Sequence, residues 1–185
     1  LGLPSLEKAI ARINMDVFGA IDFDAGTLAV DAALVDSSIA GYRLDGQAAL
    51  RARWGGANPD FALAIGGFHP RATPPAGFPA LKRVGIDLSA SAEARLRLEG
   101  YFALTSNSVQ CGARVDAFAR AGRASAEAFL AFDTLFRFDP FRFVVDLAAA
   151  ATIRLFGKPR LALDLALRLS GPEPWQASGK VRFRL

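Results

Sequence analysis

His69 is the only histidine in this chain of 185 residues, and histidine is the side chain best suited to acid–base chemistry near neutral pH. It lies in the run Gly66-Gly67-Phe68-His69-Pro70, where a proline-rich segment begins. A loop histidine can act as a general base if a carboxylate, here Asp60 or Asp87, orients its ring. It can also hydrogen-bond the backbone of its own loop, and we prefer this second interpretation. His69 is therefore a weak candidate for a polar site.

Cys111 is the only cysteine, so the chain can form neither an internal disulfide nor a cysteine-based metal cluster. It stands among the apolar positions of its segment, and a thiol buried in apolar surroundings is unreactive. The carboxylates are spread without a matched cluster, and the glycines fit neither a phosphate-binding loop nor a dinucleotide fingerprint. We expect no catalytic residues, no metal, no cofactor and no enzyme activity.

The elements that would have to position such groups follow from an alternation of apolar and polar residues between Ile13 and Leu185. From Tyr42 to Trp54, for example, apolar side chains occupy one parity and mainly charged side chains the other. Because successive side chains of a strand point to opposite faces, this period of two predicts strands with one apolar face and one charged face. Hydrophobic residues make up 52% of the chain, which is enough for a substantial core. We predict an all-β fold.

The parity of the apolar positions also predicts how the strands are joined. Residues that face each other across an antiparallel hairpin share a face, so the loop length decides whether the parity changes. The sequence predicts two-residue turns at Gly122-Arg123 and Asp139-Pro140, and five-residue loops over 156–160 and 170–174. These turns agree with one long antiparallel meander of about nine or ten strands. The pattern is compatible with a barrel-like, a sandwich or a groove shape.

We treat the chain as a single domain over residues 1–185, since no shift in composition divides it. Ser5 as N-cap, followed by apolar residues at helical spacing, predicts a short amphipathic helix over residues 1–13. The meander then occupies residues 14–185. Because the sequence starts at Leu1 rather than at a methionine, we expect it to be a fragment of a larger protein.

Two segments depart from this regular pattern. Residues 69–80 hold four of the ten prolines and are predicted to form one long loop. The apolar parity of residues 84–104 continues for longer than an ordinary strand. It predicts a bend near Ser89-Ala90-Ser91, or one strand that crosses a curved sheet.

Large apolar side chains are predicted to line a dry interior, and alanines between them leave space for a second layer or for an apolar ligand. The chain has fifteen phenylalanines but only two tyrosines, which fits a surface with few hydroxyls to satisfy. The candidate interior residues are Phe102, Leu104, Cys111, Leu130, Phe132, Phe136, Phe141, Phe143 and Leu147.

Three phenylalanines break the alternation because they fall on the charged parity. A two-residue turn at Gly122-Arg123 predicts that Phe118 faces Glu127, which places Phe129 diagonal to it. Phe156 is a third and weaker case. An outward aromatic group of this kind is a candidate contact for a partner, although aromatic pairs also stabilise sheets without any partner.

The net charge of +4 comes with arginines that alternate with acids along the predicted strands, as in Glu93 to Glu99. Opposite charges on facing positions stabilise a sheet surface, so we interpret these residues as ion-pair ladders. A nucleic-acid surface would need an unbalanced basic stripe with exposed aromatic residues. Only Lys180, Arg182 and Arg184 resemble such a stripe, and we expect no nucleic-acid partner.

Several stretches resemble a known family, the domain of unknown function 6603, which is found in very large, mostly bacterial proteins. The family has no established activity or catalytic residues. The resemblance implies a module of a long modular protein. It rests on Gly66-Gly67-Phe68-His69-Pro70-Arg71 with Pro74-Pro75, Glu99-Gly100-Tyr101-Phe102-Ala103-Leu104-Thr105-Ser106-Asn107, Phe132-Asp133 with Pro140-Phe141-Arg142-Phe143, and Ser170-Gly171-Pro172 with Pro174-Trp175.

The leading functional hypothesis is a non-catalytic structural or assembly module. Its partners would be flanking domains of the same polypeptide, or other copies that pair through the sheet edges. The alternative is a carrier or conduit for an apolar ligand such as a lipid. A transmembrane β-barrel is a lesser alternative, because two tyrosines and two tryptophans cannot make its aromatic girdles. The segment shows no signal peptide and no apolar run of helical span, and its localisation stays open.

Overall fold

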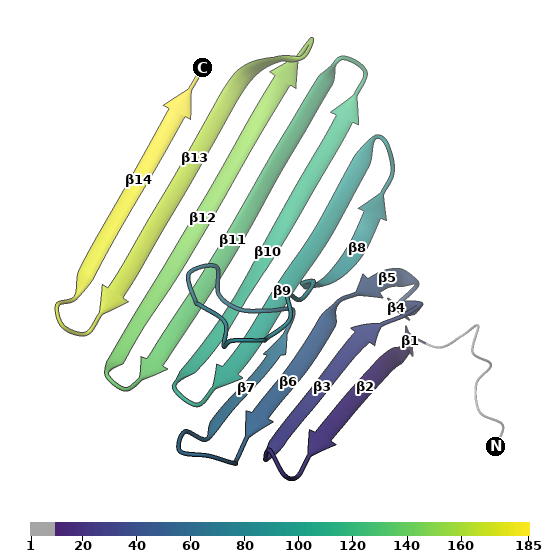
Figure 1. The fold of residues 1–185 in the computed structure, drawn as a ribbon. Helices are drawn as coiled ribbons and strands as arrows, with labels where there is room; N and C mark the ends of the chain where they lie inside the picture. The colour runs from purple at the N-terminus through teal and green to yellow at the C-terminus, as the bar shows by residue number, and fades with distance from the viewer. Residues whose placement is uncertain (1–9) are drawn as a thin grey trace.

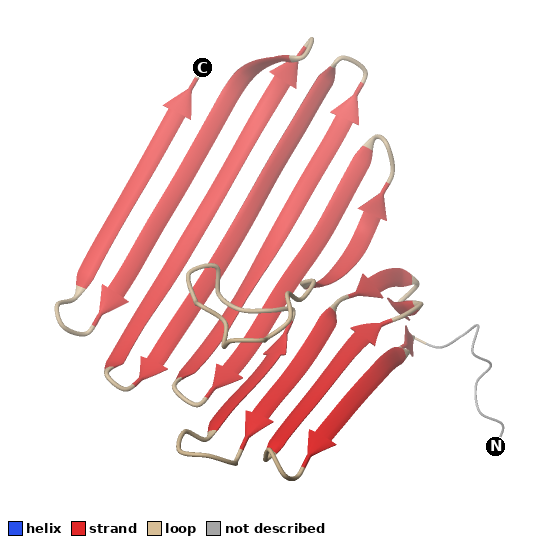
Figure 2. Ribbon diagram, viewed as in Figure 1, coloured by secondary structure: helices blue, strands red, loops and turns tan. Residues whose placement is uncertain are grey.

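The computed structural model describes residues 10–185, which form one antiparallel sheet of fourteen strands and contain no helix (Figures 1 and 2). The predicted all-β antiparallel fold is confirmed. No helix in this part of the chain could span a membrane. In chain order the strands are β1 (Ala11–Arg12), β2 (Met15–Asp22), β3 (Thr27–Leu34), β4 (Ser37–Ile39), β5 (Tyr42–Asp45), β6 (Gln47–Arg53), β7 (Asp60–Ile65), β8 (Val84–Ala90), β9 (Ala94–Thr105), β10 (Ser108–Ala121), β11 (Ala124–Phe138), β12 (Phe141–Leu155), β13 (Lys158–Gly171) and β14 (Gln176–Arg184).

From β8 to β14 the sheet is the predicted meander, in which each strand pairs with the next one in the chain. Ala121 pairs with Ala124 and Phe138 with Phe141, so both predicted two-residue turns are confirmed. The predicted loop over 170–174 also has five residues, since five residues separate the paired Ser170 and Gln176, although its place shifts by one residue. These turns hold the apolar positions of successive strands on one face.

The predicted five-residue loop over 156–160 is wrong. The turn holds only Phe156 and Gly157, both with positive φ (54° and 76°), as expected for a tight hairpin turn. The register then shifts, because Ile153 pairs with Leu161 whereas Arg154 pairs with Pro159. This β-bulge adds one residue to β13 and restores the apolar parity, so a two-residue turn followed by a bulge gives the same sequence pattern as an odd loop.

The predicted bend near Ser89-Ala90-Ser91 is a hairpin between β8 and β9. Asp87 pairs with Arg97 and Ser89 with Leu96, so a second bulge lies at Leu88. The long apolar run therefore comprises two strands that lie side by side in the sheet.

In the N-terminal half, each long strand is broken in two, and the halves lie end to end. β2 pairs with β3, β3 with β6 and β6 with β7, while β1 pairs with β4, β4 with β5 and β5 with β8. Both series end on β9, which pairs with β7 near its C-terminal end and with β8 nearer its N-terminal end. The expected count of nine or ten strands is wrong, because these breaks raise the number to fourteen.

The breaks line up across the sheet in what we call the crease. Asp36 and Gly46 have positive φ there (47° and 146°), which interrupts the extended backbone. A Cβ on Gly46 would lie 2.7 Å from the Cα of Val84, so the close approach of these two strands requires glycine. Hydrogen bonds cross the crease, such as those from Leu34 N to Gly46 O and from Gly66 N to Gln47 O.

The helix predicted over residues 1–13 is not borne out where it can be checked. Its first nine residues lie outside the described residues. Ala11 and Arg12 form β1 and pair with Ile39 and Ser38 of β4. These backbone pairings take the place of helical hydrogen bonds.

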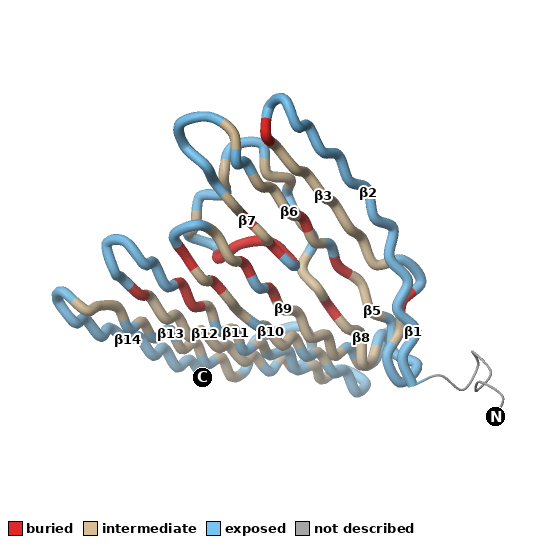
Figure 3. The backbone as a smooth tube through the Cα atoms, turned by 90° about the horizontal axis from the view of Figure 1, so that it is seen from below, coloured by how far each residue is buried: buried red, intermediate tan, exposed pale blue. Residues whose placement is uncertain are grey.

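The segment between β7 and β8, residues 66–83, lies as a loop against the charged face of the sheet (Figures 1 and 3). It contains the predicted proline-rich loop. Its Phe68 packs on alanines of β7 and β9, whose small side chains allow the loop to approach closely. Phe68 also meets Phe78 edge to face, with ring centroids 4.9 Å apart. This small core holds the loop on the sheet. Its residues are Ala62, Ala64, Phe68 and Ala103, with Ala72, Phe78 and Leu81 packed around them.

The sheet does not close on itself, and residues 10–185 form a single layer apart from this loop (Figure 3). The apolar face, which the sequence predicts to be dry, is therefore open. Val17 on β2, Leu130 on β11 and Val181 on β14 are 62%, 50% and 66% exposed. The apolar face extends from one edge of the sheet to the other.

Candidate functional site

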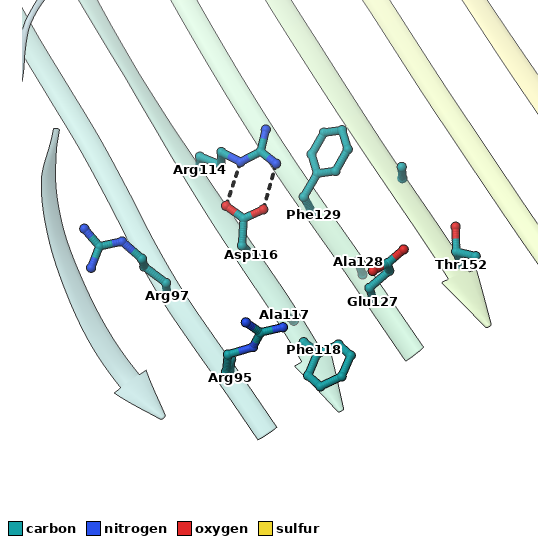
Figure 4. A pocket seen from close by; sticks show the side chains of 11 residues that line it. Arg95, Arg97, Arg114, Asp116, Ala117, Phe118, Glu127, Ala128, Phe129 and Thr152 are labelled. Carbon is teal, nitrogen blue, oxygen red and sulfur yellow. Dashed lines mark hydrogen bonds and ion pairs between the residues drawn. The ribbon is translucent and has the colours of Figure 1, made fainter. Parts of the chain in front are cut away.

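A hollow of about 490 Å³ opens on the charged face where β9 to β12 lie side by side (Figure 4). Side chains two residues apart on each strand point to this face, which gathers arginines and phenylalanines beside the small side chain of Ala150. We call it the arginine–aromatic hollow. It is lined by Arg95, Arg97, Arg114, Asp116, Ala117, Phe118, Glu127, Ala128, Phe129, Ala150 and Thr152.

The two phenylalanines of the hollow are covered by guanidinium groups. The Cζ of Arg95 lies 4.6 Å from the ring centroid of Phe118, and that of Arg114 lies 4.2 Å from the ring of Phe129. The charge attracts the negative face of the ring and hides part of its apolar surface. Phe118 also faces Glu127, as predicted. The structure therefore brings Phe118 and Phe129 together as the sequence suggested, but both are half-buried under arginines.

Most charges in the hollow already have a partner. Arg114 donates to both oxygens of Asp116, at 2.6 and 2.7 Å, and this hydrogen bonding raises the pKa of Arg114. Arg97 donates to Asp87, Glu99 and Asp45, each at 2.8 Å, and these carboxylates raise the pKa of Arg97. These pairs are the ion-pair ladders predicted from the alternation of charge. The hollow consequently offers aromatic faces and cations that hold one another in place.

Phe156 does not belong to this group. It sits in the turn between β12 and β13, is 60% exposed, and lies under Arg123 at 5.1 Å from Cζ to ring centroid. The positive φ of the turn, rather than a strand position, places it outside the apolar parity.

The candidate interior residues share the apolar face, where they are partly open to solvent. Phe143 is the most buried, and its ring meets that of Trp175 at 4.9 Å and that of Phe136 at 6.2 Å. The remaining positions are exposed at Phe102, Leu130, Phe132, Phe136 and Phe141 and half-buried at Leu104, Cys111 and Leu147.

His69, within the loop, is 2% exposed, and its hydrogen bonds do not involve the carboxylates suggested as its orienters. Its Nδ1 accepts a hydrogen bond from the backbone N–H of Arg71 at 3.1 Å. The backbone N–H of His69 donates to Gln110 Oε1 at 2.9 Å. Its Nε2 has no hydrogen-bond partner among residues 10–185. Burial lowers the pKa of His69, so the ring is neutral near pH 7. Asp60 binds Ser106, and Asp87 binds Arg97.

Sequence reasoning missed the group that anchors the loop, which we call the Tyr101 stack. The guanidinium of Arg83 lies 3.7 Å above the Tyr101 ring and donates to the carbonyl oxygens of Gly66 and Phe68. The Tyr101 hydroxyl donates to Asp133 Oδ1 at 2.8 Å, and burial raises the pKa of Tyr101. The one sequence feature that could have indicated this group is Tyr101 itself, an aromatic residue at a position of its strand where the alternation places charged side chains.

Among residues 10–185, no group of three or more histidine, cysteine or carboxylate side chains is arranged to hold a metal ion. A model of a family of unknown function, DUF6603, matches residues 1–185. The chain belongs to this family. Neither a curated protein nor a solved structure matches it.

Two of the stretches that resemble DUF6603 meet at the Tyr101 stack. Gly66 and Phe68 belong to the first stretch, and Tyr101 belongs to the second. A Cβ on Gly66 would lie 2.6 Å from the carbonyl oxygen of Gly100, so the first stretch crosses directly over the second. In this DUF6603 chain, both stretches hold the loop on the sheet.

Proposed function

We propose that this chain is a non-catalytic structural module, and that its apolar face forms one wall of a larger apolar assembly. The observation that carries the proposal is the open apolar face. Monomeric soluble proteins rarely expose a contiguous apolar patch larger than a few hundred Å². An apolar sheet face needs a second layer about 10 Å away to bury it. A flanking segment of the same polypeptide or another copy fits this role.

The charged face supports the same proposal because its groups already have partners within the chain. The loop is packed on it, its histidine is neutral and enclosed, and most arginines of the hollow are paired. The opposite face has no such cover among residues 10–185. The apolar face is therefore the surface that still needs a covering layer.

Substitution of Leu130 by glutamate tests this proposal, since Leu130 lies half-exposed within the apolar face. We expect Leu130→Glu to weaken self-association by about tenfold and to reduce binding of an apolar fluorescent dye, because a charge must then be desolvated on contact. Sedimentation velocity and dye titration measure these effects. The control is Ser125→Glu on the charged face of the same strand, where the new carboxylate would face Arg120 and Arg154.

Two results would contradict the proposal. One is that Leu130→Glu costs several kcal/mol of folding stability, as substitution in a closed core does. The other is that Ser125→Glu and Leu130→Glu change association equally.

A second candidate function, a carrier or conduit for an apolar ligand, is favoured by a row of alanines across the apolar face. Ala117 pairs with Ala128, and Ala128 pairs with Ala151. Leu96 and Leu163 border this row on the flanking strands. With strands about 4.8 Å apart, the row is a strip of small side chains about 10 Å wide, which suits an acyl chain.

A large side chain in this strip of alanines should displace a bound lipid. We expect lipid to co-purify with the wild-type chain, and Ala128→Trp to lower its amount several-fold, as measured by organic extraction and mass spectrometry. Ser125→Trp on the charged face is the control. Absence of any apolar compound from the wild-type extract would rule against this candidate.

A further inference from the structure

Within residues 10–185, the sheet has two long edges without a neighbouring strand, formed by β2 and β14. In this part of the chain β14 pairs only with β13, and β2 pairs only with β3. All nine residues of β14 and all eight residues of β2 are exposed. An edge strand offers unpaired backbone N–H and C=O groups to any chain that can align with it.

The two edges carry opposite charge on the same face. On β14 the charged-face positions include Lys180, Arg182 and Arg184, whereas on β2 they include Asp16 and Asp22. Arg184 reaches Asp164 on β13 at 3.2 Å, with its side chain still 73% exposed. Neither Lys180 nor Arg182 forms an ion pair within residues 10–185, and neither does Asp16. Asp22 accepts a hydrogen bond from Ala25 N at 2.8 Å, so the charges free to meet a partner are those of Lys180, Arg182 and Asp16.

The direction of the strands allows the two edges to join. Successive antiparallel pairings lead from β2 through β3, β6, β7, β9, β10, β11, β12 and β13 to β14. The number of these pairings is odd, so β2 and β14 run in opposite directions, as their arrows show in Figure 1. A second copy shifted sideways would bring its β2 alongside β14 in an antiparallel arrangement, with both apolar faces on the same side.

We propose that β14 of one chain pairs with β2 of a second copy, so that copies join edge to edge into a continuous sheet. In a register that places Arg182 opposite Asp16, Val181 lies opposite Val17 and Phe183 opposite Met15. On the charged face Arg182 then meets Asp16 and Lys180 lies opposite Phe18, and apolar side chains meet on the other face. The inference goes beyond the proposed function, because it concerns the edges rather than the apolar face.

The same charges disfavour the symmetric alternatives. Two β14 strands in antiparallel pairing would place basic residues opposite basic residues, and two β2 strands would place carboxylates opposite carboxylates. Repulsion against the wrong pairing gives specificity as effectively as attraction in the right one. Lysine on an edge strand is also a common defence against pairing with unrelated chains.

Charge reversal on each edge tests the proposal with the whole chain. The first variant carries Lys180→Glu and Arg182→Glu, and the second carries Asp16→Lys and Asp22→Lys. Each variant alone should associate at least about tenfold more weakly than wild type in sedimentation velocity at low salt. An equimolar mixture should recover association, because the reversed, acidic β14 of the first variant can then pair with the reversed, basic β2 of the second. The unreversed β14 of the second variant can likewise pair with the unreversed β2 of the first.

The mixture separates edge pairing from contact through the apolar face. Leu130→Glu leaves both edges unchanged, so failure of the proposed function would appear in that variant alone. Association by wild type should also weaken as salt is raised from about 50 to 500 mM. A wild-type chain that stays monomeric at low salt would overturn the proposal, as would reversed variants that associate like wild type or a mixture that shows no recovery.

Discussion

Gly112→Val is expected to lower the free energy of unfolding by about 3 kcal/mol or more, which combines overpacking with the loss of a partly buried hydrogen bond. Gly112 on β10 faces Tyr101 on β9, and the tyrosine ring lies over it. A Cβ at this position would collide with that ring and would lie 2.7 Å from both Asp133 Oδ1 and the carbonyl oxygen of Phe132. The ring of Tyr101 would therefore have to move away from its position over β10.

Displacement of Tyr101 would also release the loop, because the guanidinium of Arg83 rests on the tyrosine ring. Denaturant unfolding followed by circular dichroism measures the loss of stability. Gly100→Ala is the matched control, since its Cβ would meet only the carbonyl oxygen of Gly112 at an acceptable 3.4 Å. Equal loss in both variants would show that the Tyr101 stack does not hold the loop in place.

The second large effect is the pH dependence of folding stability. Burial lowers the pKa of His69 below 6.5, its value in the unfolded chain, so the unfolded state takes up a proton first as the pH falls. The free energy of unfolding should therefore be highest above about pH 6.5 and should decrease as the pH falls from there through the folded-state pKa. His69→Gln should remove this part of the pH dependence.

Because His69 is the only histidine, the difference between the two proteins isolates its contribution. Unfolding by denaturant between pH 5 and pH 8 provides the measurement. At pH 8 the variant should lose about 1–3 kcal/mol, since Nδ1 no longer accepts from Arg71 N. Parallel curves for wild type and His69→Gln would contradict the prediction.

The face of the sheet to which each side chain points could be predicted from the sequence wherever the backbone stays regular. The turns at Gly122-Arg123 and Asp139-Pro140 follow from it, because alternation ties every side chain to one face. It fails where one extra residue enters a ladder, as at Leu88 and beside Arg154, since a bulge hides the true length of the turn. It also fails at Asp36, where a positive φ divides a strand without changing the pattern of polarity.

The contacts beneath the loop could not be read from the local pattern. The hydrogen bond from His69 N to Gln110 joins residues 41 positions apart, and that from Tyr101 to Asp133 joins residues 32 positions apart. Nothing near either partner in the sequence specifies the other. Likewise, the apolar face was predicted from the sequence. The alternation within a single sheet does not specify, however, what covers that face.

The N-terminal half of the sheet, which the crease interrupts, has shorter ladders than the C-terminal half. Between β11 and β12 fifteen residue pairs act together, whereas β1 and β4 share two pairs and β5 and β8 share three. Short ladders open locally at much lower cost than long ones. If copies join edge to edge, each copy would thus contribute a stiff part, built from the long ladders of β9 to β14, and a more easily deformed part, built from the short ladders beside the crease.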